Sequence, residues 1–547
     1  MKGLMQEWPL LVHRVLDHAA RWHGEREIVS RTVEGPIHRE TYRDLELRSR
    51  ALASAARARL QIKEGDIVAT MAWNGYRHME IWYAIMGLGA VVHTLNPRLF
   101  LDQLNFIINH AEDQWVFTDL TFIPIFERLQ AQIPTVKGFV IMTDVAHMPE
   151  ATTLKNVICY EELVEQGDIG LQWPRIDENT ACGLCYTSGT TGKPKGVLYS
   201  HRSNVLHAMS MQFADTQAIS SADRVLPIVP MFHANAWALA FSAPMAGADL
   251  VMPGSKLDGA SVYELLTTER VTFSAAVPTI WLMLLQHLEQ DATRQLPNLK
   301  RVVIGGSACP EFIMRAFTEK YGVEVLHGWG MTETSPVGSI SQIKGSMAHL
   351  NAEEKWKQRA KQGRPQFTVE MKITDDLNQA LAHDGKVFGQ LKVRGPAISS
   401  AYFKGDGSAA FDSDGWFETG DVATIDDWGF MQITDRSKDV IKSGGEWISS
   451  IELENVATGC AGVAEAAAIG LPHLKWDERP LLIVVKKPGA EVSKEQVMAH
   501  LTGKIAKWWL PDDIVFADQI PHTAAGKISK LQLRETFKDY RWPMSES

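Results

Sequence analysis

The sequence reads Tyr186-Thr187-Ser188-Gly189-Thr190-Thr191-Gly192-Lys193-Pro194-Lys195-Gly196 between two apolar runs, residues 181–186 and 197–199. Both runs are predicted to be strands, which makes the segment between them a long hairpin loop. Glycines let backbone amides approach a ligand closely, and Ser, Thr and Lys supply donors and positive charge, as a polyphosphate requires. The spacing differs from the common phosphate loop G-x-x-x-x-G-K-[ST]. We interpret the segment as a phosphate-binding loop of another kind, with a flexible surface turn as the alternative.

Length and composition narrow the class of protein. A chain of 547 residues is too long for one core, so we expect at least two domains. The content of 45% hydrophobic and 22% charged residues is typical of globular proteins, and the net charge of −10 argues against nucleic acid as the main partner. The first residues do not resemble a signal peptide, and the longest uncharged window, residues 225–248, contains three prolines and does not fit a membrane helix. We therefore expect a cytoplasmic protein.

Five scattered cysteines also favour a reducing compartment. Cys182 and Cys185 have the spacing of half a metal site or of a redox pair. No second pair follows nearby in the sequence, and both residues fall in a predicted strand. We interpret them as buried core thiols rather than zinc ligands.

Alternating helical and strand-like segments predict an α/β fold of layered, mostly parallel sheets. Helical periodicity covers residues 42–60, and short apolar strands occur at 66–71 and 90–95. We expect a large N-terminal domain of layered α/β sheets with a β-rich subdomain, residues 1–434, and a small α+β C-terminal domain, residues 435–547, joined by a hinge. The expected elements of the small domain are helices at 450–456 and 494–508 and strands at 464–471 and 480–485.

A second cluster, residues 328–334, follows a strand-like segment and combines an aromatic residue, a hydroxyl and a carboxylate. Trp329 offers a flat face for adenine, Thr332 a donor to phosphate, and Glu333 an oxygen ligand for Mg²⁺. A solvent-facing turn is the alternative. Upstream, residues 305–308 form a Gly-Gly-Ser turn after a predicted strand, which alone is a weak signal.

The motifs together resemble those of the AMP-forming adenylating enzymes, which include the acyl-CoA synthetases, the adenylation domains of peptide synthetases and the beetle luciferases. The loop at 186–196 resembles their signature loop, and residues 328–333 resemble their Y-G-x-T-E motif, with Trp329 replacing the usual tyrosine. Residues 419–421 resemble the T-G-D motif, and residues 521–530 fit P-x-T-x-x-G-K-x-x-K. The motifs occur in the order typical of the family, and the resemblance covers nearly the whole chain.

The resemblance implies roles for single residues. Asp421 would accept hydrogen bonds from both ribose hydroxyls, Arg436 would contact the ribose–phosphate side, and Asp435 would be the hinge. Lys527 would bridge the attacking carboxylate and the α-phosphate. The implied catalytic residues are Lys527, Thr332, Glu333, Lys442 and His233, and the implied metal ligands are Glu333 and Thr187. The implied ATP- and AMP-binding residues are Thr187, Ser188, Gly189, Thr190, Thr191, Gly192, Lys195, Gly306, Ser307, Ala308, Gly328, Trp329, Gly330, Met331, Asp421 and Arg436.

Two further sets follow from the same resemblance. A loop in the small domain would face the pantetheine arm of CoA, although a β-turn is needed there in any case. An acyl pocket would lie beside the run at 230–237, with core packing as the alternative role of Trp237. The implied CoA-binding residues are Ser443, Gly444, Gly445 and Glu446, and the implied acyl-pocket residues are Trp237, Val277 and Gly305.

The implied reaction uses ATP, Mg²⁺ and CoA in two half-reactions, through an acyl-adenylate. Residues 199–203, 442–449 and 475–480 resemble the branch that holds bacterial medium-chain fatty-acid ligases and 3-(methylthio)propionate–CoA ligases. That branch favours a short or medium unbranched acid. The alternatives are an aryl or long-chain acid–CoA ligase, a peptide-synthetase module, a luciferase-like oxidase and a non-catalytic binding protein. No membrane span is expected, and a homodimer is one assembly that the sequence leaves open.

Overall fold

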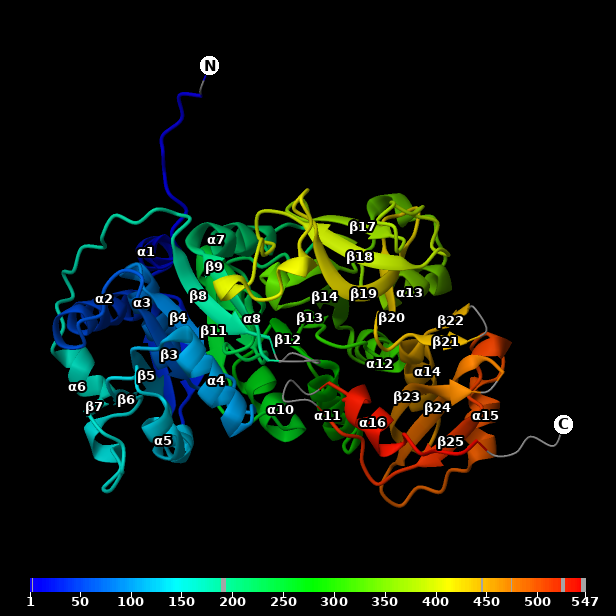
Figure 1. Ribbon diagram of the computed structural model, residues 1–547. Helices are drawn as coiled ribbons and strands as arrows, with labels where there is room; N and C mark the ends of the chain where they lie inside the picture. Colours follow the sequence, from blue (N-terminus) through cyan, green and yellow to red (C-terminus); the bar gives the residue numbers. More distant parts are fainter. Residues whose placement is uncertain (2, 188–192, 444–445, 474, 523–526, 543–547) are drawn as a thin grey trace.

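The computed structural model describes residues 1–547 except 2, 188–192, 444–445, 474, 523–526 and 543–547. The described residues form two large sheets, a four-stranded sheet and a C-terminal sheet (Figure 1). This arrangement confirms the predicted α/β class with a smaller α+β C-terminal part. In the described part of the chain, no helix combines the length and the apolar character needed to cross a membrane.

The first large sheet carries the predicted phosphate loop at one edge. Its seven strands run in the order β7-β6-β5-β3-β4-β8-β9, parallel except for the antiparallel pair β8–β9. Parallel strands are buried on both faces, which is why all four residues of β4 are buried. The strands are β3 (Ile67–Met71), β4 (Val91–Thr94), β5 (Trp115–Thr118), β6 (Phe139–Ile141), β7 (Val157–Cys159), β8 (Ala181–Tyr186) and β9 (Gly196–Ser200).

The second large sheet has nine strands in the order β16-β15-β14-β13-β12-β10-β11-β1-β2. Its central strands are parallel, and antiparallel strands close both edges. They are β1 (Glu27–Arg31), β2 (Ile37–Thr41), β10 (Arg224–Pro227), β11 (Asp249–Met252), β12 (Phe273–Ala276), β13 (Arg301–Ile304), β14 (Glu324–Gly330), β15 (Val337–Ile340) and β16 (Arg364–Pro365). The sequence predicts that residues 328–330 lie after a strand. In the structure they belong to β14, because pairing with β15 extends that strand through Gly330.

Helices pack on both sheets. The largest apolar cluster joins side chains of α1, α2, α3 and α9 with strands of both large sheets. α2 begins where Thr41 caps the helix, since its side chain accepts from the Asp44 amide and Asp44 reaches back to the Thr41 amide. The helices of this part are α1 (Val12–Trp22), α2 (Tyr42–Arg59), α3 (Tyr76–Gly87), α4 (Leu101–Ala111), α5 (Ile123–Leu129), α6 (Tyr160–Glu165), α7 (His201–Ser210), α8 (Ala234–Trp237), α9 (Leu239–Ala246), α10 (Gly259–Thr268), α11 (Pro278–Glu289), α12 (Glu311–Tyr321) and α13 (Ala352–Ala360).

The remaining elements form two smaller units. The predicted β-rich tract is an antiparallel sheet of β17 (Glu370–Thr374), β18 (Gly389–Arg394), β19 (Phe417–Ile425) and β20 (Met431–Arg436). The C-terminal elements gather together in Figure 1, in orange and red. They are β21 (Ile441–Ser443), β22 (Glu446–Ile448), α14 (Ser450–Thr458), β23 (Val463–His473), β24 (Asp477–Lys486), α15 (Lys494–Leu501), β25 (Asp513–Phe516) and α16 (Lys530–Thr536).

One expected helix is wrong in length. The helix predicted over residues 494–508 ends at Leu501, because Thr502 leaves the helical conformation and Gly503 adopts φ +80°. Glycine has no Cβ to oppose that left-handed conformation, so it ends the helix at little cost. The division at residue 434/435 stays a prediction.

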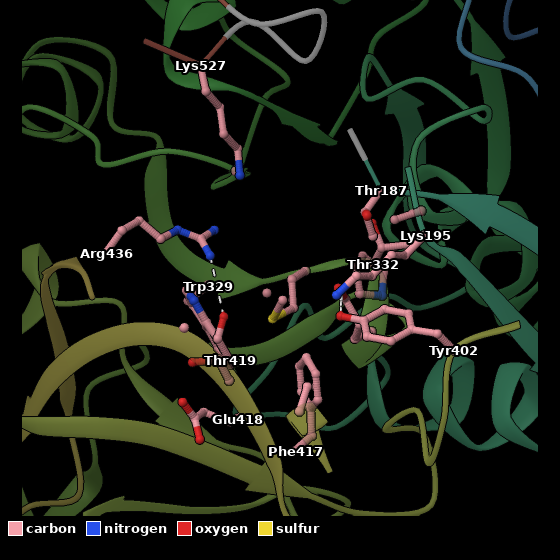
Figure 2. A pocket seen from close by; sticks show the side chains of 18 of the residues that line it. Thr187, Lys195, Trp329, Thr332, Tyr402, Phe417, Glu418, Thr419, Arg436 and Lys527 are labelled. Carbon is pink, nitrogen blue, oxygen red and sulfur yellow. Dashed lines mark hydrogen bonds between the residues drawn. The ribbon is translucent and has the colours of Figure 1, made fainter. Parts of the chain in front are cut away.

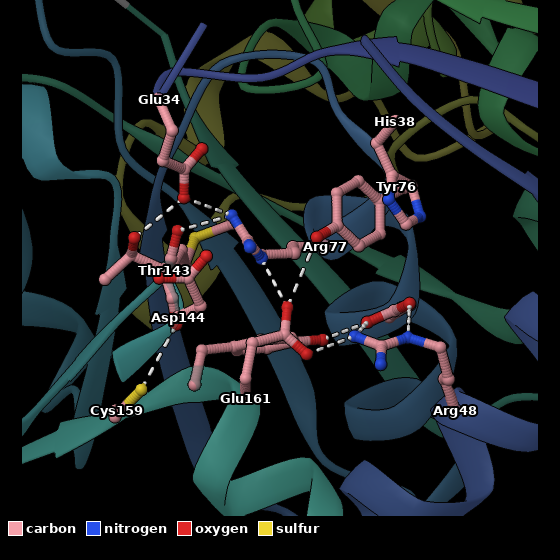
Figure 3. A network of polar contacts seen from close by, with 12 residues as sticks. Glu34, His38, Arg48, Tyr76, Arg77, Thr143, Asp144, Cys159 and Glu161 are labelled. Atoms are coloured by element: carbon pink, nitrogen blue, oxygen red, sulfur yellow. Dashed lines mark hydrogen bonds and ion pairs between the residues drawn. The ribbon is translucent and has the colours of Figure 1, made fainter. Parts of the chain in front are cut away.

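A largely buried polar network links three helices to the turn after β1 (Figure 3). The Arg77 guanidinium donates to Glu161 and to Glu34, each at 2.7 Å, and Arg48 donates to Glu161 at 2.8 Å and to Glu80 at 2.5 Å. These side chains come from α2, α3, α6 and the turn after β1. Each of the five named side chains therefore has an opposite charge beside it, and the charges are paired with one another.

Candidate active site

A cavity of about 1060 Å³ lies where the two large sheets, the β17–β20 sheet and the C-terminal unit meet. Figure 2 shows the labelled side chains pointing into it from all of these parts. The predicted site residues that line the cavity are Thr187, Lys195, His233, Trp237, Gly305, Gly306, Gly328, Trp329, Gly330, Met331, Thr332, Glu333, Arg436 and Lys527. The structure thus brings together residues that lie up to 340 positions apart in the chain (527 − 187).

One end of the cavity is built around Asp421. The Trp329 indole donates from Nε1 to Asp421 Oδ2 at 2.9 Å, and Arg436 Nε lies 2.9 Å from Asp421 Oδ1. Asp421 and Arg436 also face each other in the β19–β20 ladder. The tryptophan that replaces the usual tyrosine therefore orients a carboxylate as well as offering an aromatic face. Such a fixed carboxylate is suited to accept hydrogen bonds from sugar hydroxyls.

Glu333 forms part of the cavity wall next to Thr332. It lies in a short turn after β14, and its side chain is only 4% exposed. Burial raises the pKa of its carboxyl, while the hydroxyl of Tyr402, donating to Oε1 at 2.6 Å, counteracts that rise. The Tyr199 hydroxyl holds the same turn by donating to the Thr332 carbonyl at 2.7 Å. The turn is therefore fixed from two sides and presents a carboxylate to the cavity.

Lys527 reaches the cavity from the C-terminal unit (Figure 2). Burial lowers the pKa of its ammonium to about 8, with a smaller contribution from the nearby Arg436 guanidinium, and Asp421 and Glu333 act in the opposite direction. The second lysine of the same motif, Lys530, has a different environment. Its Nζ lies 3.0 Å from Glu454 of α14 and 3.9 Å from Asp435 of β20, where the C-terminal unit meets the β17–β20 sheet.

The base of the predicted phosphate loop lies at the other end of the cavity. The Thr187 amide donates to the Lys195 carbonyl at 2.9 Å and continues the β8–β9 hairpin. The Lys195 ammonium lies 4.8 Å from the centre of the Tyr402 ring, which connects this end to Glu333. The predicted residues Ser188, Gly189, Thr190, Thr191 and Gly192 lie outside the described residues.

The apolar end of the cavity contains His233 and Trp237. Burial, followed by the charges of Lys527 and Arg98, lowers the pKa of His233 to about 4, so this imidazole is neutral. Residues 234–238 have φ between +46° and +67°, and α8 is thus a single left-handed turn. This turn places the Trp237 ring 3.4 Å from where a Cβ on Gly305 would stand. Trp237 therefore closes one wall of the cavity.

Residues 16–403 match the family model of the AMP-binding enzymes, and residues 452–527 match the model of the AMP-binding enzyme C-terminal domain. The chain belongs to the AMP-binding enzyme family.

Curated relatives and solved structures agree with this membership. The chain is 47% identical to the medium-chain-fatty-acid–CoA ligase of Ectopseudomonas oleovorans, with 98% of both chains covered. It is 48% identical to the 3-methylmercaptopropionyl-CoA ligase of Ruegeria lacuscaerulensis (strain DSM 11314 / KCTC 2953 / ITI-1157), with 98% of this chain and 99% of the relative covered. Among solved structures, the anthranilate CoA ligase AuaEII in complex with anthranoyl-AMP matches with a TM-score of 0.84 at 22% identity, over 97% of this chain and 99% of that chain.

Some residues predicted for this AMP-binding enzyme lie away from the cavity. Lys442 is exposed on β21, where its amide donates to Glu478, and Ser443 is buried and accepts from Arg479 at 3.1 Å. Asp435 is buried in β20 and accepts from the Ser450 amide at 2.9 Å. Ser307, Ala308 and Val277 are absent from the described cavity lining, as is Asp421, which reaches it through Trp329 and Arg436. Gly444, Gly445 and the side chain of Glu446 lie outside the described residues.

The predicted core thiols are confirmed. Cys182 is buried in the largest apolar cluster and Cys185 in the cluster around β18 and β19. Cys182 Sγ accepts from the Asn204 side chain at 3.2 Å, and Cys185 lies 3.2 Å from the Thr94 hydroxyl. Three residues apart on a strand, the two side chains point to opposite faces and pack in separate cores.

Sequence reasoning missed several cavity residues of this family member. Tyr402 donates a hydrogen bond to Glu333. Phe106, His110 and Asp406 line the end of the cavity at the base of the predicted phosphate loop, here called the phosphate end. They come from α4 and from the loop before β19, and none of them belongs to a motif that can be recognised in the sequence. Only the folded arrangement shows that these segments meet the signature loop.

Proposed function

We propose that the protein is an ATP-dependent acid–CoA ligase that works through an acyl-adenylate. The observation that carries this proposal is the convergence of Lys527, Glu333 and the Trp329–Asp421–Arg436 group on one cavity, together with the phosphate-loop base. The curated relatives at 47–48% identity have acid–CoA ligase names.

In the first half-reaction, a carboxylate oxygen of the acid attacks the α-phosphorus of ATP. The bond between that phosphorus and the bridging oxygen breaks, and pyrophosphate leaves with the electron pair. The Lys527 ammonium neutralises the charge that develops on the α-phosphate, and neutral His233 lies beside the carboxylate without adding charge. Asp421 and Arg436 hold the ribose, and Trp329 offers its face to adenine.

Mg²⁺ is expected to accompany ATP as part of the substrate. The carboxylate of Glu333 suits such a hard cation, because it is a buried oxygen donor on the cavity wall, and the Thr187 hydroxyl is the second candidate ligand. Bound Mg²⁺ would offset charge on the phosphate oxygens. The Tyr402 hydroxyl fixes the orientation of Glu333 for this role.

In the second half-reaction, the CoA sulfur attacks the acyl carbon, the bond from that carbon to the AMP oxygen breaks, and the thiol proton is released. Lys442 and the predicted CoA loop belong to the C-terminal unit, as does Lys527, but Lys442 lies away from the cavity lining. We propose that the unit from residue 435 onward rotates about Asp435. The face with Lys442 and the predicted CoA loop would then replace the face with Lys527 at the cavity.

The acid that we propose is short or medium-chain and unbranched, 3-(methylthio)propionate included. Trp237, Val303, Met331 and Val337 give the acyl end an apolar lining, which suits such a chain. Aryl and long-chain acids are the alternative substrates. A cytoplasmic location and a homodimer stay predictions.

The test is AMP release and thioester formation with purified protein, ATP, Mg²⁺ and CoA. The panel comprises straight-chain acids from C2 to C16, benzoate and 3-(methylthio)propionate. We expect both products in equal amounts, with the highest kcat/KM for an acid of up to about ten carbons. A highest kcat/KM for benzoate or for C16 would overturn the proposed acid class. AMP release without thioester for every acid would overturn the assignment as a CoA ligase.

A further inference from the structure

The phosphate end of the cavity contains a histidine that the adenylation motifs do not include. His110 lies in the last turn of α4 and lines the cavity beside Thr187, Lys193 and Lys195. Its ring stacks on Phe106, with centroids 5.3 Å apart, and meets Phe403 edge-on at 5.7 Å. Aromatic packing on two sides therefore holds the imidazole in one orientation.

Tyr186, the first residue of the signature loop, fixes the tautomer of this imidazole. The Tyr186 hydroxyl lies 2.7 Å from His110 Nδ1. Burial raises the pKa of the Tyr186 phenol and lowers that of His110, so both groups are neutral. The Asp406 carboxylate lies on the Nε2 side of the ring and favours the tautomer with its hydrogen on Nε2, to which the phenol donates at Nδ1. The hydrogen of His110 is then on Nε2. A neutral imidazole with an acceptor at Nδ1 is a donor at Nε2.

Among the described residues, no acceptor lies within hydrogen-bond distance of the Nε2 atom. Its neighbour Asp406 has Oδ2 at 3.6 Å, which exceeds hydrogen-bond distance. The other charged groups that face the ring are Lys404 and Glu112, which pair with each other at 2.5 Å, and His93, whose Nδ1 lies 2.9 Å from Asp113. The Nε2–H group is therefore fixed in orientation and has no hydrogen-bond acceptor in the described part of the chain.

Two cations make this end of the cavity suitable for an anion. Lys193 Nζ lies 5.2 Å from the centre of the Phe106 ring on which His110 stacks, and Lys195 Nζ lies over Tyr402. Among the described residues, no carboxylate oxygen lies within 4.0 Å of either ammonium nitrogen, the distance that defines an ion pair. The two lysines can therefore offer their charge to a ligand.

We propose that His110 is a pyrophosphate-binding residue, whose Nε2–H donates to an oxygen of the two terminal phosphates of ATP and of the pyrophosphate that leaves. Tyr186 acts through His110 as a positioning residue. This inference rests on the proposed function, because it assigns a part of the same cavity. It also gives the signature loop a second role, since its first residue orients a donor on another element.

The decisive variant is His110→Phe, which keeps the aromatic stack and removes the donor. In ATP–pyrophosphate exchange, we expect the KM for pyrophosphate to rise about tenfold, as for the loss of one hydrogen bond to a charged group. His110→Gln, which restores a donor, should recover part of this loss. Tyr186→Phe keeps the aromatic ring and should raise the KM for pyrophosphate by a smaller factor than His110→Phe does. The control is His147→Phe, because His147 is exposed and is not among the residues that line the cavity.

Two further measurements separate a binding role from a structural one. The second half-reaction, from supplied acyl-adenylate and CoA, should change less than twofold in His110→Phe, and the melting temperature should match that of the control. An unchanged KM for pyrophosphate, or an equal loss in both half-reactions, would overturn the inference. Calorimetric titration of Mg-pyrophosphate needs no turnover. If the wild type binds pyrophosphate more tightly than His110→Phe but forms no thioester, the inference stands and the proposed function fails.

Discussion

The chain uses charge in two opposite ways, in the network around Arg77 and at the cavity. In the network, arginines and glutamates from α2, α3 and α6 bind each other, and both partners are largely removed from water (Figure 3). At the phosphate end of the cavity, Lys193 and Lys195 face an open space and contact aromatic rings. Removing one partner from such a buried charge cluster is strongly destabilising, whereas charge left available at a cavity binds ligands. Changing residues in each region should therefore affect different properties.

The largest effect is expected in the network. Arg77→Met leaves the buried Glu34 without its cation and Glu161 with Arg48 alone, and such a loss typically costs about 3–5 kcal/mol of unfolding free energy. Urea denaturation measures this loss. The matched control is Arg315→Met, a surface arginine with three glutamate partners, which should cost less than about 1 kcal/mol. Equal losses in the two variants would mean that the network contributes no more to the unfolding free energy than surface ion pairs do.

Lys527→Ala should give the largest loss of activity with little loss of stability. Removing a cation that stabilises developing charge typically lowers the rate by about 10²–10³-fold. We expect that loss in acyl-adenylate formation, measured by ATP–pyrophosphate exchange, and a much smaller loss when acyl-adenylate and CoA are supplied. Lys538→Ala, at an exposed pair with Glu535, is the control. Equal losses in the two half-reactions would contradict the assigned role.

Trp329→Phe keeps an aromatic face and removes the indole donor to Asp421. The buried carboxylate then lacks one partner, and we expect the KM for ATP to rise roughly tenfold, the effect of about 1.4 kcal/mol. The KM for the acid should not change. The control is Trp22→Phe, whose ring is 65% exposed. An unchanged KM for ATP would show that the ring face alone contributes to binding.

Counted per pH unit, the smallest effect is the dependence of stability on pH. Burial raises the pKa of Glu40 to about 8, so the folded protein keeps a proton that the unfolded chain loses above about pH 4.5. Stability should therefore fall as the pH rises from about 4.5 to 8, by at most about 1.4 kcal/mol per pH unit. Glu40→Gln should flatten this slope in melting temperatures taken from pH 5 to 9. The exposed Glu353→Gln is the control, and slopes that stay parallel in both variants would refute the expectation.

The sequence predicted those parts of the site that lie in contiguous motifs. Trp329, Glu333 and Lys527 were found because each belongs to a short pattern whose spacing fits one element, and all three line the cavity. Tyr402 and His110 could not be found in this way, since their roles arise from contacts between segments distant in the chain. The same limit applied to β14, which tertiary pairing with β15 lengthens beyond its apolar run.

The left-handed turn of α8 has a consequence for redesigning the proposed acyl pocket. Ala234, Ala236 and Ala238 hold a conformation that costs alanine about 1–2 kcal/mol each, whereas glycine adopts it freely. Their methyl groups are at most 2% exposed, and burying one methyl group returns about 0.8 kcal/mol. Packing and backbone preference thus nearly cancel at these positions. Glycine is therefore a low-cost substitution there, so the wall of the proposed acyl pocket can be redesigned through its backbone as well as through the side chain of Trp237.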